Sequence, residues 1–190
     1  MTEEPYAHLP SSSNDVLARL TNQDEQHVAF TLEVTKDLFS NEQQRTREIE
    51  QKAGILVGAA GVAAAVLTSI GAFLVDSRQV LEGWPLIAIC VLFIALAISF
   101  SCSVVLALRV LLVGKVHYPG PSVVFDKQAA SAAEYKRAHA ADLFAAFSNN
   151  IDKNNHKAAT LRCAQIAFGA FVAILLVTGL FTTFVSLFLD

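Results

Sequence analysis

The chain has 190 residues, of which 54% are hydrophobic and 16% are charged, and its formal net charge at pH 7 is −3. The mean hydropathy is +0.47, and the charges are concentrated in residues 1–53 and 109–162. These values argue against a small soluble bundle, because such a bundle would need three helices that are apolar on every face. A cleaved signal peptide is not expected either, since the first apolar run begins only at residue 54.

The N-terminal part of the chain is predicted to be cytoplasmic. Residues 1–13 are polar and rich in turn-forming residues, a composition typical of disorder. Residues 14–53 are predicted to form a helix, which Asn14 or Asp15 can cap. Within residues 47–67 no proline or turn residue separates the charged part from the apolar run. One continuous helix is therefore expected to pass from solvent into a membrane.

A narrow apolar seam follows one face of this first helix. Val28, Leu32 and Phe39 recur at helical spacing, whereas Glu and Gln fill the other face. Such a seam cannot build a core alone. We expect it to contact another helix, either of the same chain or of a neighbouring subunit.

Three uncharged stretches are long enough to cross a bilayer, since a span needs roughly 20 residues at about 1.5 Å each. These stretches are residues 54–75, 84–108 and 163–189. We therefore predict an all-α membrane protein with three transmembrane helices and long cytoplasmic helical extensions. The expected bounds of the spans are 54–76, 84–113 and 162–189, with an outer hairpin at 77–83 and a cytoplasmic loop and helix at 114–161.

The Lys and Arg residues predict the orientation in the membrane. Thirteen of the 14 precede the first span or lie between or at the inner ends of the second and third, and only Arg78 lies in the outer hairpin. The positive-inside rule then places the N-terminus in the cytoplasm and the C-terminus outside. Trp84 is expected at the headgroup level, and Pro85 suits the first turn of the second span because its missing N–H would be unpaired there anyway.

The cytoplasmic segment 114–161 is predicted to begin with a break. The sequence HYPGPS at residues 117–122 cannot continue a helix, because its two prolines flank a glycine. Asp126 is the expected cap of an alanine-rich helix that follows. After the polar sequence SNNIDKNNHK, the chain is expected to return to the membrane at Arg162.

The sequence contains no pattern typical of an enzyme or of a metal site. It has no glycine-rich phosphate loop, no Cys and His nucleophile signature and no HExxH. The three cysteines lack metal-ligand spacing and are expected to be packing residues. The spans carry no carboxylate, which disfavours a proton-coupled transporter. We expect neither catalysis nor a cofactor nor a bound metal.

Small and hydroxyl-bearing residues recur along the spans. The small residues of the first span are Gly54, Gly58, Gly61 and Ala65, and the hydroxyl-bearing residues of the other two are Ser99, Ser103, Thr178, Thr182 and Ser186. Close helix packing is one interpretation, because small residues let helix backbones approach in a bilayer. The other is a weakly polar pore wall between several copies of the chain.

Two stretches resemble a family of bacterial membrane effectors. EIEQKAGILVGAAGVAAAVL, a charged helix that passes into a small-residue span, is similar to the first span of SLATT-type and Pycsar-type effectors of anti-phage systems. NNIDKNNHKAATLRCAQIAFGAFVAILL is similar to their Asn-bearing polar helix before the last span. The resemblance covers approximately positions 45–114 and 140–189, while positions 1–40 have no counterpart in it and SLATT itself has two spans.

The resemblance implies an effector that disrupts the bacterial inner membrane when a partner nucleotidyltransferase or cyclase signals infection. The signal would be a cyclic nucleotide or an oligonucleotide, and in Hailong-type systems an oligomeric DNA product holds the channel closed. Candidate contacts for its phosphates are Lys127, Lys136, Arg137, Lys153 and Lys157, with Tyr135 or Phe147 available for stacking. The alternative is that these cations bind no ligand, because the positive-inside rule by itself accounts for Lys and Arg residues on the cytoplasmic side.

A homo-oligomer with four subunits is our central expectation, since three spans in one copy are too few for a conventional transporter with repeated halves. Membrane lipids are the other expected partners. Two alternatives remain open at this point: a membrane-anchored scaffold without channel activity, and a small transporter.

Overall fold

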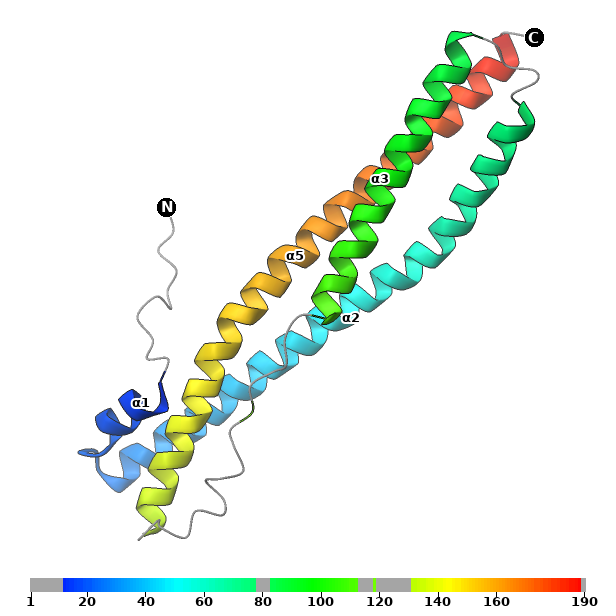
Figure 1. Ribbon diagram of the computed structural model, residues 1–190. Helices are drawn as coiled ribbons and strands as arrows, with labels where there is room; N and C mark the ends of the chain where they lie inside the picture. The colour runs from blue at the N-terminus through cyan, green and yellow to red at the C-terminus, as the bar shows by residue number, and fades with distance from the viewer. Residues whose placement is uncertain (1–11, 78–82, 113–117, 119–130, 189–190) are drawn as a thin grey trace. The chain divides into compact units, whose positions relative to one another are not determined.

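The computed structural model describes residues 12–77, 83–112, 118 and 131–188, and for residues 73–77 and 186–188 it describes the backbone alone. All regular structure in these ranges is helical (Figure 1). The four helices are α1 (Ser13–Leu20), α2 (Glu25–Ser77), α3 (Trp84–Leu112) and α5 (Ala132–Phe188). The chain divides into two compact units, which we call the polar unit (residues 1–48 and 114–156) and the span unit (residues 49–113 and 157–190).

The helix predicted over residues 14–53 begins as two helices. Ser12, and not Asn14 or Asp15, caps α1, because its hydroxyl accepts a hydrogen bond from the Asn14 N–H at 3.2 Å. The chain turns after Leu20, and the Asp24 carboxylate then accepts a hydrogen bond from the His27 N–H at 2.7 Å. Short polar side chains that satisfy free N–H groups thus start both helices and separate them.

The apolar seam of the N-terminal region is covered within the same chain. Phe39 packs with Leu143, Phe147 and Ile151 of α5, and Leu32 lies beside them. In the same unit, the two buried apolar residues of α1 pack on the alanine-rich start of α5: Val16 and Leu20 contact Ala140 and Ala141. Of the two partners predicted for the seam, the structure shows a helix of the same chain.

Both long helices continue from the polar unit into the span unit. Helix α2 includes the whole stretch 47–67, which confirms the predicted continuous helix. Helix α5 likewise includes the polar sequence at 148–157 and the apolar run after it. Ser131 lies at the described start of α5, where its hydroxyl accepts a hydrogen bond from the Glu134 N–H at 3.2 Å. The predicted cap Asp126 lies outside the described residues.

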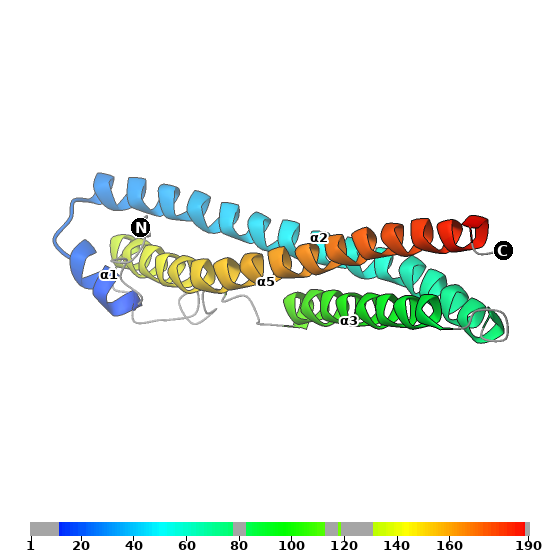
Figure 2. The same ribbon diagram turned by 90° about the horizontal axis from the view of Figure 1, so that it is seen from above.

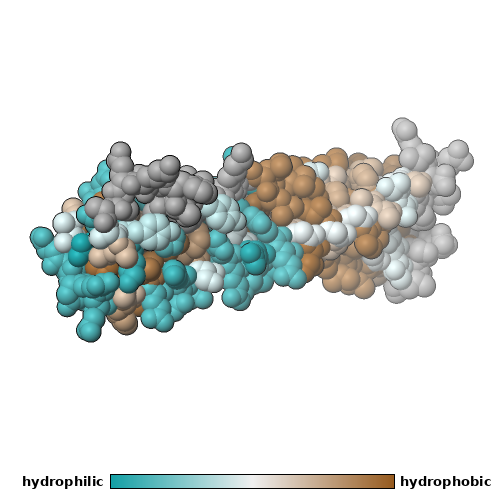
Figure 3. Space-filling model, turned by 90° about the horizontal axis from the view of Figure 1, so that it is seen from below, coloured by the Kyte–Doolittle hydropathy of each residue, from teal (hydrophilic) through white to brown (hydrophobic). Residues whose placement is uncertain are grey.

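The span unit is built from three helices that are long and apolar enough to cross a membrane, as predicted. Ala63 of α2, Leu96 of α3 and Phe171 of α5 meet in one cluster, and Figure 2 shows the three helices side by side there. Only 17% of the most apolar window of each helix is buried inside the protein. Most apolar side chains of this unit therefore face outward (Figure 3), which indicates a multi-pass membrane protein.

Helix α3 begins at Trp84 and Pro85, where the second span was predicted to begin. Pro85 is the second residue of the helix, where a missing N–H removes no helical hydrogen bond. Gly83 precedes the helix with φ of +81°, a backbone conformation that favours glycine. Trp84 is 64% exposed, and its ring meets Phe181 of α5 edge-on at a centroid distance of 6.0 Å. An exposed Trp ring that contacts a partly buried Phe suits the headgroup level.

Candidate functional site

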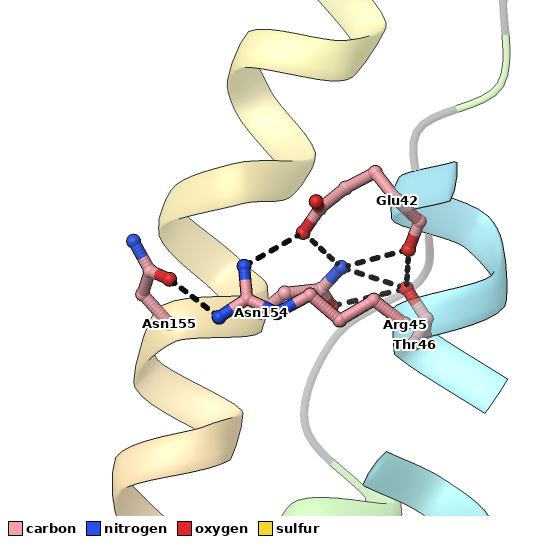
Figure 4. Close-up of polar contacts among 5 residues, drawn as sticks. All are labelled: Glu42, Arg45, Thr46, Asn154 and Asn155. Carbon is pink, nitrogen blue, oxygen red and sulfur yellow. Dashed lines mark hydrogen bonds and ion pairs between the residues drawn. The ribbon is translucent and has the colours of Figure 1, made fainter. Parts of the chain in front are cut away.

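The polar unit contains a buried network of hydrogen bonds between α2 and α5 (Figure 4). Glu42 and Thr46, one turn apart on α2, are 8% and 3% exposed, and Asn154 of α5 is 2% exposed. The Asn154 amide donates to the Glu42 carboxylate at 2.7 Å, and it lies 2.8 Å from the Thr46 hydroxyl and 3.2 Å from the Glu42 carbonyl. One amide therefore contacts three oxygen atoms of the facing helix.

A second layer covers this network on its solvent side. The Arg45 guanidinium lies 3.3 Å from the Glu42 carboxylate and donates to the Asn155 side-chain oxygen at 2.9 Å. Its side chain is 43% exposed, so the charge of the nearly buried carboxylate is balanced by a cation that water still reaches. The arrangement fixes the register of α2 against α5 in this unit, because a shift along either helix would leave Glu42 and Asn154 buried without partners.

The span unit has its own polar contact between the same two helices. The Lys157 ammonium is 2.7 Å from the Glu50 carboxylate, and the two side chains are 3% and 40% exposed. The charge of the buried Lys157 ammonium is therefore balanced by Glu50, whereas the Glu50 carboxylate also reaches solvent. In the same unit, four residues form a buried cluster: Ile49, Ala53, Val110 and Leu161. An ion pair and a small apolar cluster thus join the three helices near the ends of their uncharged stretches.

Buried residues on both long helices recur in alternating steps of three and four. On α2 the fully buried members are Val28, Thr35, Phe39, Glu42, Thr46, Ile49, Ala53, Ala60 and Ala63. The partly buried Leu32 and Leu56 fill the two gaps in this series. On α5 this spacing relates the buried residues Ala140, Leu143, Phe147, Asn150, Asn154, Lys157, Leu161 and Ala164, and Phe171, Thr178 and Val185 continue it in steps of seven. Three other buried residues of α5, Ala141, Ala146 and Ile151, lie beside this series. This spacing is typical of coiled-coil packing.

Sequence reasoning missed Glu42, Thr46 and Asn154, although a signal for them was present. The steps of three and four that relate Leu32 to Phe39 continue on α2 through both polar residues. A seam defined by its apolar members alone stops at Phe39, because the next members are Glu42 and Thr46. Continuing the same spacing through polar residues would have predicted that Glu42 and Thr46 are buried.

The structure separates the cations predicted to contact phosphates. Lys136 and Arg137 lie together in the first turns of α5, in the polar unit. Lys153 is 17 residues beyond Lys136 on that helix, which corresponds to about 25 Å. Lys157 belongs to the span unit and is buried against Glu50, and Lys127 lies outside the described residues. No single small nucleotide can reach both Lys136 and Lys153 along this helix.

The two aromatic residues predicted to stack on a base, Phe147 and Tyr135, differ in burial. Phe147 is 6% exposed and belongs to the buried cluster around Phe39, so its ring has no free face for a base. The Tyr135 ring is only partly buried and stacks on His139 at a centroid distance of 6.1 Å. Of the two, Tyr135 alone lies beside the adjacent cations at the start of α5.

The basic start of α5 contacts the turn between α1 and α2. Arg137 donates to the Gln23 carbonyl at 2.9 Å, and the Lys136 ammonium lies 3.3 Å from the Glu25 carboxylate. The Lys136 and Glu25 side chains are 40% and 67% exposed, so this pair is weak. The Arg137 Nε is buried and has no hydrogen-bond partner among the described residues.

The hydroxyl groups predicted to line a pore have hydrogen-bond acceptors inside the chain. Ser103 is 1% exposed and donates to the Ala164 carbonyl of α5 at 3.0 Å. The other three described hydroxyl groups, those of Ser99, Thr178 and Thr182, donate to carbonyls of their own helices. The side chain of Ser186 lies outside the described residues. Ser103 and Thr178 are buried within one chain, whereas Ser99 and Thr182 are partly exposed.

The small residues predicted to pack helices form an open ridge on α2. Gly54, Gly58, Gly61 and Ala65 are exposed, and a Cβ atom added at any of the three glycines would meet nothing within 4 Å. The contacts within the chain use a different face of the helix, whose buried residues are Ala53, Ala60 and Ala63. The glycine ridge therefore has space for another helix, and no described residue of the chain fills it.

The cysteines differ from the prediction. Cys90, Cys102 and Cys163 are free and exposed, so they are not packing residues within the chain. Each cysteine lies on a face of its helix that is not buried within the chain. The apolar sequence around the cysteine does not reveal which face this is. Among the described residues, no group of three or more His, Cys, Asp or Glu side chains could hold a metal ion.

No family model, no curated protein and no solved structure matches the chain. The function is therefore inferred from the fold and from the contacts of the described residues.

Proposed function

We propose that the chain is a membrane effector of bacterial anti-phage defence, which forms an ion-conducting homo-oligomer controlled by a nucleotide or oligonucleotide. The observation that carries the proposal is the series of buried residues along α2 and α5. Its polar members Glu42 and Asn154 belong to the polar unit, and its apolar members Ala63 and Phe171 belong to the span unit. A ligand that changes the packing of the polar members acts on the helices that form two of the three spans.

The open glycine ridge supports assembly of several copies. Small residues at Gly54, Gly58 and Gly61 allow two helix backbones to approach closely in a bilayer. No helix in the described part of one chain makes this approach, so the ridge is available to a second copy. Four copies remain our central expectation, in the inner membrane with the N-terminus in the cytoplasm.

The start of α5 is the described part of the chain best suited to a phosphate. Lys136 and Arg137 are adjacent, Lys136 is held by an exposed ion pair, and Arg137 has one N–H group without a described partner. Tyr135 supplies an aromatic face beside them. A phosphate that displaced Glu25 from Lys136 would gain two cations and a stacking surface.

Ion flux through liposomes that contain only this protein tests the proposal. We expect flux that changes at least severalfold when a cyclic nucleotide or a short oligonucleotide is added. The variant Lys136→Gln with Arg137→Gln should conduct but lose the nucleotide response. The matched control is Arg19→Gln with Lys36→Gln, which removes two exposed cations of the same unit. Absence of flux under every nucleotide condition would overturn the channel proposal.

A membrane-anchored scaffold is the second candidate, and the hydroxyl groups of the spans favour it. Ser99, Ser103, Thr178 and Thr182 all donate within the chain. None of these four groups needs water from a pore to satisfy its donor. A protein that forms oligomers in nanodiscs but passes no ions would support the scaffold.

A further inference from the structure

Three exposed cations mark one level of the span unit. The cluster of Ala53, Val110 and Leu161 brings α2, α3 and α5 together there, and these residues are 0%, 1% and 5% exposed. Each has a cation beside it in the sequence, and these cations are Lys52, Arg109 and Arg162. All three cations are exposed. Since neighbouring residues on a helix differ by about 1.5 Å in height, the Cα atoms of the three cations lie at nearly the same level as this cluster.

These cations are unpaired in the described part of the chain. None of the three forms an ion pair with a described residue. Glu50 is the only acidic residue among the described side chains of the span unit, and it is 2.7 Å from Lys157. The level therefore carries three positive charges that no described carboxylate pairs, although Glu48 lies one turn before Lys52 on α2, where it accepts a hydrogen bond from Gln44 at 3.0 Å.

The position of this level along α3 matches the thickness of a bilayer. Arg109 is 25 residues from Trp84, which corresponds to about 38 Å along the helix. A bilayer measures about 30 Å across its hydrocarbon core and about 40–45 Å with its headgroups. When Trp84 lies among the headgroups of one leaflet, Arg109 lies among those of the other. An apolar surface separates the two levels (Figure 3).

We propose that Lys52, Arg109 and Arg162 form a binding site for anionic phospholipid headgroups, which we call the cationic girdle. Phosphate oxygens of an anionic lipid accept hydrogen bonds from Lys and Arg, and the acyl chains lie against the apolar surface beside them. A zwitterionic lipid offers the same phosphate with a cation attached, so it binds less tightly. The proposal goes beyond the proposed function and does not depend on ion conduction.

Native mass spectrometry of the detergent-solubilised protein tests the girdle, with phosphatidylglycerol and phosphatidylcholine as the two probes. We expect tighter binding of phosphatidylglycerol. Each cation contributes about fivefold to this preference, so Lys52→Gln, Arg109→Gln and Arg162→Gln together should reduce it at least about tenfold. The charge-conserving variant with Lys52→Arg, Arg109→Lys and Arg162→Lys should keep it, which separates charge from folding.

Two further arms complete the test. The remote variant Arg19→Gln with Lys36→Gln should keep the preference, because both cations belong to the polar unit. Glycerol 3-phosphate, which has the phosphate but no acyl chains, should not compete at concentrations equal to the lipid. The proposal is overturned if the triple Gln variant keeps the preference, if the remote variant loses it equally, or if glycerol 3-phosphate competes as well as the lipid does.

Discussion

Replacing Asn154 by leucine removes the centre of the buried network at nearly constant side-chain size. The Glu42 carboxylate then loses its 2.7 Å donor and keeps only the Arg45 contact at 3.3 Å. A hydrogen bond to a charged group contributes about 1.5–3 kcal/mol, and a buried acceptor without a donor costs a similar amount. We expect Asn154→Leu to destabilise the contact between α2 and α5 in the polar unit by about 2–3 kcal/mol.

Amide hydrogen exchange measures this change locally. A loss of about 2–3 kcal/mol corresponds to exchange that is about 30 to 150 times faster at positions 42–46 and 150–154. The matched control is Asn155→Leu, which removes one exposed hydrogen bond to Arg45 and should change exchange less than about fivefold. Glu42→Leu combined with Asn154→Leu should recover most of the loss, since both polar partners are then absent. Equal effects of the two single Asn variants, or additive effects in the double variant, would refute the reasoning.

Three other outcomes are expected. Gly58→Leu should leave the fold of one chain intact, because a Cβ atom added there meets nothing within 4 Å, but it should abolish oligomers in nanodiscs and toxicity in cells. The control Val105→Leu, at another exposed position, should keep the fold, the oligomers and the toxicity. Glu50→Leu should destabilise the span unit by about 2–4 kcal/mol and Lys157→Met by about 1 kcal/mol, as thermal unfolding can measure, because only the first leaves a buried charge without a partner. In a background without native cysteines, an impermeant thiol reagent applied outside should label a cysteine at Gln79 and not one at Ser131, and the reverse pattern would contradict the orientation.

The sequence was sufficient to predict the three long apolar helices and the helix that joins charged and apolar parts. Both follow from local features, the length of uncharged runs and the absence of proline, which tertiary contacts do not alter. The turn at positions 21–24 was missed because Asp24 is equally compatible with a helix surface and with a cap. The exposure of Cys102 and the burial of Ser103, one position apart, depend on which face of α3 meets α5.

The polar residues among the buried positions have a physical reason to be there. Apolar contacts have no direction and tolerate a shift of one helix against the other, so apolar contacts alone hold α2 and α5 in register only weakly. The hydrogen bonds of Asn154 and the ion pair of Lys157 specify that register, because each is lost when one helix shifts against the other. Hydrogen bonds contribute about 1 kcal/mol each in net terms, so the preferred register exceeds its alternatives by only a few kcal/mol. A ligand that binds one register about 100-fold more tightly than another supplies about 3 kcal/mol, which is the same order. The buried contacts are thus strong enough to define one arrangement of the two helices and weak enough for the nucleotide that we propose as ligand to change it.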